Sequence, residues 1–322
     1  IEFLEARCLR LDEAMSLVVL LDVTASAWSE REATTGGAAA MLRGATLTTA
    51  MEALLVYMNA YLLLDERNTL SVLGWGLGRR CAVLYPRHGA EEASRSMEEV
   101  VMCGLRALQE EGDGDAAASA SGGGAQFSAA LSRALCQHNR RIHGGSGSGE
   151  VEGAAAGGSG NAGAAAVAAA ESAASALPGR ILAVQVAADD AAEYVQVMNC
   201  IFCAKKMNVV IDSCVLGRRE SSLLQQASSL TGGLNLRVPV DRQRHPVLLG
   251  TLLANFLPDA ALRASALTEL HPSKKVSQKA VCFATHKPVA IASVCSVCLA
   301  VFDRAAASAM SACASCGTAI AR

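Results

Sequence analysis

The hydrophobic pattern of the chain is organised around a short run of branched apolar residues near its start. Residues 17–21 are all Leu or Val, and Asp22 ends the run. A run this short and this rich in branched residues is typical of a strand buried on both faces, in the middle of a parallel sheet. Because open α/β sheets bind ligands beyond the carboxyl ends of their strands, Asp22 and the hydroxyls of Thr24 and Ser26 lie where a site is expected.

The rest of the chain alternates between strand-like and helix-like patterns. A polar loop containing Trp28 is expected after the first strand, and Pro258 is expected to kink or split the last helix. Further strands are predicted at 69–76, 80–85, 180–187, 209–216 and 234–238. Helices are predicted at 46–64, 91–110, 125–141, 191–206, 221–230 and 245–266. This alternation predicts an α/β fold, with a doubly wound, mostly parallel sheet covered by helices on both sides.

Two low-complexity segments interrupt the pattern. Residues 112–124 and 144–176 consist almost entirely of Gly, Ala, Ser and acidic residues, so we expect them to be inserts that contribute nothing to the core. The length of 322 residues allows one large domain with a small appendage. We therefore expect an α/β domain over residues 1–268 and a separate C-terminal module over residues 275–322.

The C-terminal module contains the most specific motif in the chain. Cys295 and Cys298 form one C-x-x-C pair, and Cys313 and Cys316 form a second pair after fourteen intervening residues. Four thiolates with this spacing suit one structural Zn²⁺ ion in a tetrahedral site. The alternatives are two disulfides or four free thiols. A module this small has too little apolar mass to fold without such a crosslink, which favours zinc.

Charge and the remaining chemistry exclude several classes of function. The formal net charge is −2, so the chain as a whole is not built to bind nucleic acid or an anionic membrane. No uninterrupted apolar run approaches the roughly 20 residues that a membrane span needs. None of the six His residues stands beside a Ser or Cys in a recognisable catalytic motif, and the glycines of residues 74–80 lack phosphate-loop spacing. The sequence therefore shows no recognisable nucleophile–base pair and no phosphate-binding loop.

Several segments together resemble one family. They are YVQVMNCIFCAKKMNVVIDSCVLG (194–217), LLQQASSLTGGLNLRVP (223–239), ANFLPDAALR (254–263) and VCSVCLAVF (294–302). These segments resemble the smaller von Willebrand A-like subunit of the general transcription and DNA-repair factor TFIIH. The resemblance is close over residues 180–317, looser over residues 17–84, and skips both low-complexity segments.

This resemblance implies a von Willebrand A-like domain joined to a four-cysteine zinc module. It further implies a non-catalytic, nuclear, structural subunit of the TFIIH core that supports transcription initiation by RNA polymerase II and nucleotide excision repair. The implied partners are other TFIIH core subunits, especially the larger von Willebrand A-like, zinc-binding subunit. The family tends to carry extra Cys and His around its knuckles, where this chain has Ala284, Thr285 and Asp303.

Two functions of other classes remain as alternatives. The Asp-x-Thr-x-Ser pattern of Asp22, Thr24 and Ser26 resembles the metal-dependent adhesion motif of A domains, and with Asp189 or Asp190 it would suit Mg²⁺. The interpretation we favour is that Asp22 caps the following loop while the hydroxyls bond to local backbone. The second alternative is a zinc ribbon that binds nucleic acid; there we expect Phe283 and Phe302 to form a small core instead.

Overall fold

The computed structural model describes most of the α/β domain and most of the cysteine-rich segment. The described residues are 15–33, 46–77, 80–86, 95–114, 127–143, 178–190, 193–239, 245–259, 262–263, 280, 282–285, 289–314 and 316–319. The greater part of both predicted inserts lies outside these ranges, as does the expected boundary between residues 268 and 275. The proposed division of the chain at that boundary is therefore still a proposal.

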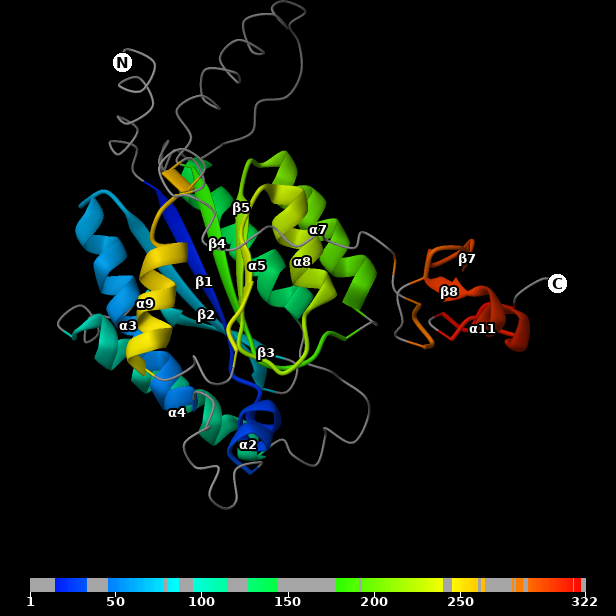
Figure 1. Cartoon of the computed structure of the whole chain (residues 1–322), viewed down its shortest axis with the longest axis horizontal. Coiled ribbons are helices and arrows are strands. Elements are labelled where there is room, and N and C mark those ends of the chain that lie inside the picture. Colours follow the sequence, from blue (N-terminus) through cyan, green and yellow to red (C-terminus); the bar gives the residue numbers. More distant parts are fainter. Residues whose placement is uncertain are drawn as a thin grey trace, which may run out of the picture.

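A six-stranded sheet forms the centre of the molecule (Figure 1). Its strands in chain order are β1 (Ser16–Asp22), β2 (Thr69–Leu77), β3 (Arg80–Tyr85), β4 (Gly179–Gln185), β5 (Val210–Val215) and β6 (Asn235–Arg237). They lie in the order β3-β2-β1-β4-β5-β6. Only β3 is antiparallel, because it returns directly from β2 as a hairpin. The predicted doubly wound, mostly parallel sheet is confirmed, and β1 lies at its centre with all seven residues buried.

Helices cover both faces of the sheet (Figure 1). The helices are α2 (Ala25–Ala33), α3 (Leu47–Leu64), α4 (Met97–Gly114), α5 (Phe127–His143), α7 (Tyr194–Lys206), α8 (Ser222–Thr231) and α9 (His245–Phe256). One buried cluster joins the odd-numbered residues of β1 to α3, α4 and α9. A second joins the even-numbered residues of β1 to α5, α7 and α8. Because successive side chains of a strand point to opposite faces, β1 contributes to both clusters.

Local signals explain where several helices begin and end. The Thr46 side chain caps α3 by accepting a hydrogen bond from the backbone N–H of Thr49 (3.1 Å). Ser221 caps α8 in the same way through the N–H of Leu224 (3.0 Å). Gly232 ends α8 with a positive φ of 78°, a conformation that glycine adopts at little cost.

Three predictions about the helices needed correction or refinement. The segment after β1 is not a polar loop: it forms α2, and Trp28 within it is 4% exposed. Helix α4 continues to Gly114, so the first residues of the predicted linker are helical. Helix α9 ends at Phe256, and Leu262 and Arg263 are helical again, as expected for a helix split at Pro258.

Helix α3 is long and apolar enough to cross a membrane by length and composition, the one such helix among the described residues. It has eight buried residues, and it packs on the sheet as part of the first core cluster. Core helices pass the same length test, so this finding is weak evidence for a membrane span.

The cysteine-rich segment forms a small unit of its own. It contains the antiparallel pair β7 (Ala292–Val294) and β8 (Val301–Asp303), followed by α11 (Arg304–Ala309). Figure 1 shows these elements apart from the central sheet. Phe283 and Phe302 pack edge to face with ring centroids 6.0 Å apart, and Phe302 is 1% exposed. These two aromatic residues form the expected small core, and the burial of Phe302 removes it from any surface on which bases could stack.

Candidate functional site

Two C-x-x-C turns bring four cysteines together. The sulfur atoms of Cys295, Cys298, Cys313 and Cys316 all lie within 4.8 Å of one another. Each turn is closed by a backbone hydrogen bond, from Leu299 N–H to the Cys295 carbonyl (3.0 Å) and from Gly317 N–H to the Cys313 carbonyl (2.8 Å). The sequence predicted this set of residues, and their sulfur atoms are arranged so that they could hold one metal ion.

No disulfide joins any two of the four cysteines. The Cys295 and Cys316 sulfurs are 3.8 Å apart, and the Cys298 and Cys313 sulfurs are 3.6 Å apart. A disulfide requires about 2.05 Å between the two sulfurs. All four cysteines are therefore free thiols that face a common centre.

Left-handed backbone follows each turn. Gly317 has a φ of 72°, as its identity predicts, and Leu299 takes the equivalent position with a φ of 61°. A residue with a side chain pays about 1–2 kcal/mol for this conformation. The cost at Leu299 indicates that the turn geometry, which directs the two sulfurs inward, overrides the local preference of the backbone.

Hydrogen bonds favour the thiolate form that binds metals. Backbone N–H groups of Cys298 and Val297 lower the pKa of Cys295. Hydrogen bonding with Thr318 lowers the pKa of Cys316 to about 6; its Sγ lies 3.2 Å from Thr318 Oγ1. A thiolate is the form of cysteine that ligates a metal ion, so both turns are prepared for one.

Cys282 does not belong to the cluster. It is buried, and its sulfur accepts a hydrogen bond from the backbone N–H of Asp303 (3.1 Å). His286, its conceivable co-ligand, lies outside the described residues. Cys282 acts here as a small buried residue that attaches one loop of the unit to β8.

Asp22 is the other candidate site residue, and both of its carboxylate oxygens accept hydrogen bonds from the protein itself. It is 0% exposed. Its Oδ1 accepts hydrogen bonds from the backbone N–H and the hydroxyl of Thr24 (3.0 and 2.6 Å). Its Oδ2 accepts from the N–H groups of Val186 and Ala187 (2.9 and 2.7 Å), just beyond β4. The carboxylate therefore fastens the carboxyl ends of β1 and β4 together, which supports the interpretation of Asp22 as a cap.

Thr24 and Asp189, two of the other proposed Mg²⁺ ligands, form hydrogen bonds within the protein, and Ser26 is exposed on α2. The Thr24 hydroxyl donates to Asp22, and Ser26 is an exposed residue in the first turn of α2. Asp189 accepts hydrogen bonds from the Ser221 hydroxyl (2.5 Å) and the N–H of Leu223 (3.1 Å), so it caps α8. Among the described residues, the four-cysteine cluster is the only group of three or more Cys, His, Asp or Glu arranged to hold a metal.

Replacing Asp22 by Ala should therefore destabilise the α/β domain whether or not Mg²⁺ is present. The substitution leaves the N–H groups of Val186 and Ala187 buried without an acceptor, and each such loss costs about 1–3 kcal/mol. We expect the free energy of unfolding to fall by about 2–4 kcal/mol in urea titrations. In the unsubstituted chain, Mg²⁺ should not move the unfolding midpoint; a stabilisation that disappears in Asp22→Ala would restore the cation-site interpretation.

Gly76 permits the close approach of β2 to the Asp22 loop. Its φ is 107°, and a Cβ atom there would lie 2.2 Å from Thr24 Oγ1. Gly76→Ala should cost about 2 kcal/mol or more, from backbone strain and the clash together, in the same urea titration. Gly232→Ala is the matched control, since its φ is 78° but no atom lies within 4 Å of the new Cβ. If both variants lose equal stability, the close contact at Gly76 contributes nothing.

The hydrophobic pattern of the sequence does not predict a buried ionic network that the structure contains. The carboxylate of Asp212 on β5, 0% exposed, accepts from Arg180 Nε on β4 (2.5 Å) and from Arg263 Nη2 (2.9 Å). Arg263 also donates to the carbonyls of Asn255 and Pro258, at the end of α9 (3.1 and 3.2 Å). This network therefore joins the segment after α9 to the sheet. The only signal of this network in the sequence was the position of Arg180 and of Asp212 in the apolar runs that form β4 and β5.

The fold and the cysteine cluster together define the class of protein. The chain is an α/β protein with a doubly wound, mostly parallel sheet that has β1 at its centre, and a four-cysteine unit follows this sheet. The solved N-terminal domain of TFIIH p34 has this fold: it matches with a TM-score of 0.52 at 23% identity, over 74% of this chain and 99% of that domain. The family model "Transcription factor Tfb4" matches residues 15–317, and the chain belongs to the Tfb4 family.

Two curated relatives agree with this assignment. General transcription factor IIH subunit 3 of Dictyostelium discoideum is 29% identical over 291 residues, which cover 83% of this chain and 66% of that protein. The general transcription and DNA repair factor IIH subunit tfb4 of Schizosaccharomyces pombe is 26% identical over 306 residues, which cover 90% of this chain and 85% of that protein. The chain thus spans slightly under two thirds of the first relative and most of the second.

Proposed function

We propose that this chain is a non-catalytic structural subunit of the TFIIH core, and that it supports transcription initiation and nucleotide excision repair by docking other subunits. The observation that carries the proposal is the match to the Tfb4 family over residues 15–317. The relatives' names, which include a general transcription factor subunit and a transcription and DNA repair factor subunit, support it. A nuclear location follows from this role.

The carboxylates at the carboxyl edge of the sheet form hydrogen bonds within the protein, which supports a structural role. In A-type folds this edge is where a ligand would bind. Here Asp22 and Asp189 accept hydrogen bonds from the protein's own backbone and hydroxyl groups. These carboxylates are used to fasten strands and cap helices, so the rigidity of the domain depends on them.

We further propose that Cys295, Cys298, Cys313 and Cys316 hold one Zn²⁺ ion. Four sulfur donors within 4.8 Å of one another form the soft, tetrahedral donor set that zinc prefers. The ion would supply the crosslink that a unit with so few buried residues needs, since its buried apolar side chains in the described ranges are those of Cys282, Ala300, Phe302 and Cys313. The two C-x-x-C turns would then present a rigid surface for a partner subunit.

The partners proposed are the other TFIIH core subunits, in particular the larger von Willebrand A-like, zinc-binding subunit. Direct contact with nucleic acid is not part of the proposal, because Phe302 is buried in the core of the cysteine-rich unit and the net charge of the chain is −2. We propose that the chain divides into two structural units, the α/β domain (residues 1–268) and the C-terminal module (residues 275–322).

Affinity capture of the tagged chain from nuclear extract tests this function. We expect TFIIH helicase and kinase subunits to be recovered by mass spectrometry, with one zinc ion per chain by elemental analysis of the same sample. Recovery of the chain with zinc but without those subunits would overturn the assignment to TFIIH and leave the metal site intact. Recovery of the subunits without zinc would overturn the metal proposal alone.

A further inference from the structure

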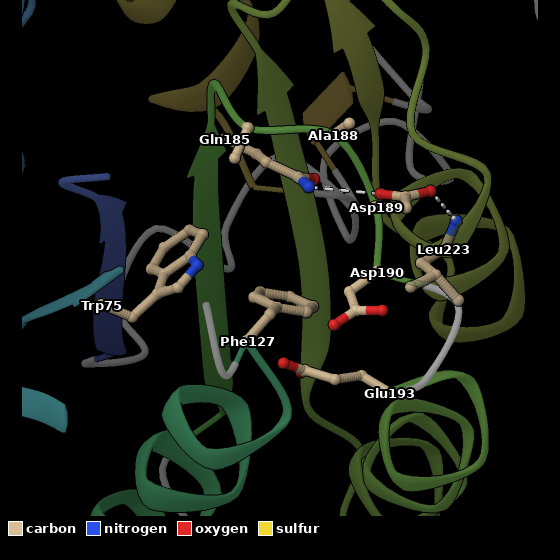
Figure 2. Close-up of a pocket in the computed structure, with 9 residues that line it drawn as sticks. Trp75, Phe127, Gln185, Ala188, Asp189, Asp190, Glu193 and Leu223 are labelled. Atoms are coloured by element: carbon tan, nitrogen blue, oxygen red, sulfur yellow. Dashed lines mark hydrogen bonds between the residues drawn. The ribbon is translucent and has the colours of Figure 1, made fainter. Parts of the chain in front are cut away.

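A small cavity opens at the carboxyl edge of the sheet, beside the N-terminal ends of α5, α7 and α8 (Figure 2). Its volume is about 20 Å³, which is room for one group of the size of a water molecule. The residues that decide its chemistry are Trp75, Phe127, Gln185, Asp189, Asp190 and Glu193. The proposed structural role in TFIIH does not use this cavity, and the Mg²⁺ alternative touched it only through Asp189 or Asp190.

Two aromatic rings form one side of the cavity. Trp75 and Phe127 lie with their ring centroids 5.3 Å apart and their planes at 53°. Both are largely buried, with 2% and 7% of their surfaces exposed. The face of an aromatic ring carries partial negative charge and attracts cations, most strongly for Trp.

Carboxyl groups form the opposite side. Figure 2 shows the carboxylates of Asp190 and Glu193 beside the ring of Phe127. Asp189 is held by neutral donors, among them the Gln185 amide (3.2 Å) and the backbone N–H of Leu223 (3.1 Å). Glu193 accepts from the backbone N–H of Ser128 (2.6 Å) at the start of α5, yet burial raises the pKa of this carboxyl. The N-terminal ends of the three helices contribute partial positive charge of about half a unit each, but the three carboxyl groups that line the cavity outweigh it. The cavity therefore favours a positive charge, which would offset the desolvation of Glu193.

Gln185 supplies an independent indication of a ligand. Its side chain is in the cavity wall and the residue is 6% exposed. Its Nε2 donates to Asp189, but its Oε1 is buried and accepts no hydrogen bond within the described part of the chain. A buried acceptor without a donor is costly, by about 1–3 kcal/mol, and calls for a donor from outside.

We propose that this cavity binds the ammonium group of a lysine side chain of a partner protein. An ammonium group has three N–H donors and no acceptor, which matches an orphaned amide oxygen, nearby carboxylates and an aromatic wall. The small volume selects for an ammonium group over the larger, planar guanidinium of arginine. The cavity is thus a point of attachment for one basic side chain at the edge where A-type folds meet their ligands.

Fluorine NMR of the full chain tests this proposal directly. The chain contains only Trp28 and Trp75, so labelling with 5-fluorotryptophan gives two resonances, which the variant Trp28→Phe assigns. The probe is Nα-acetyl-lysine amide, and the matched control probe is Nα-acetyl-norleucine amide, which has the same carbon chain without the ammonium group. We expect saturable movement of the Trp75 resonance with the lysine probe, at least tenfold tighter than with the norleucine probe, and no movement of Trp28.

Substitutions in the cavity should weaken this binding. Glu193→Gln removes the charge but keeps an acceptor for the Ser128 N–H, so the domain should stay folded, and we expect at least fivefold weaker binding of the lysine probe. Glu52→Gln, at an exposed position on α3, is the control with the same change in net charge. Equal binding of the two probes, an absence of saturation, or an equal effect of the two substitutions would each overturn the proposal and leave the cavity as a site for water.

Discussion

Replacing Cys295 by Ser should unfold the C-terminal module and leave the α/β domain folded. The buried apolar residues of the module's described part are Cys282, Ala300, Phe302 and Cys313, which is too little apolar surface to stabilise a fold of this size. If the four cysteines hold Zn²⁺ as proposed, its binding energy, about 10–16 kcal/mol in small zinc units, would be most of the folding energy of the module. We expect loss of bound zinc and rapid proteolysis after about residue 270, while the urea unfolding of the α/β domain keeps its midpoint.

Cys203→Ser is the matched control for this experiment. Cys203 is an exposed cysteine on α7, far in the sequence from the cluster, so its replacement removes one thiol without touching the metal ligands. Zinc content and resistance to proteolysis should be unchanged in this variant. If Cys295→Ser also abolished cooperative unfolding of the α/β domain, the proposed division into two independently folding units would be wrong.

Replacing Asp212 by Ala should be the most damaging single substitution in the α/β domain. Its carboxylate is 0% exposed and lies between two guanidinium groups, those of Arg180 (4% exposed) and Arg263. Without it, the charge of Arg180 stays buried and unpaired. Breaking a buried ion pair by removing one partner costs about 3–5 kcal/mol. Urea titration followed by far-UV circular dichroism should show a loss of this size.

Two further variants separate this charge effect from the loss of packing. The double variant Arg180→Met with Asp212→Leu replaces the most deeply buried pair by apolar groups and leaves Arg263, whose side chain is 15% exposed, without its carboxylate partner. It should recover the part of the lost stability that comes from the buried charge of Arg180, because apolar residues often replace buried pairs at little cost. Asp65→Ala removes the acceptor of the exposed side chain of Arg67 and should change stability little. A double variant as unstable as Asp212→Ala would contradict the electrostatic explanation.

The regular elements were largely predictable because their signals are local. Branched apolar runs bounded by polar residues predicted β1, β4 and β5 to within about two residues at each end. Thr46 and Ser221 marked the starts of α3 and α8, since a hydroxyl at this position caps the first turn in any context. The four-cysteine cluster was equally predictable, because C-x-x-C turns impose their own geometry.

The functions of the charged residues were not predictable in the same way. Asp22 at the end of β1 fitted a cation site by sequence, but the N–H groups that occupy its carboxylate come from residues 186 and 187, which are distant in the chain. Trp28 belongs to a helix because its indole N–H donates to the carbonyl of Asp22 (2.9 Å) and its ring is buried. The hydrophobic pattern of the segment after β1 predicts neither the hydrogen bonds of the Asp22 carboxylate nor the burial of Trp28.

The order of the elements, the parallel sheet, the cluster of four cysteines and the family resemblance were thus all present in the linear pattern of residues. The pairing of Arg180 and Arg263 with Asp212, the use of Asp22 to join two strands, and the cavity between Trp75 and Glu193 arise only when distant segments meet. The physical reason is that hydrophobic periodicity and turn geometry act over a few residues, whereas the partner of a buried charge is chosen by the packing of the whole domain.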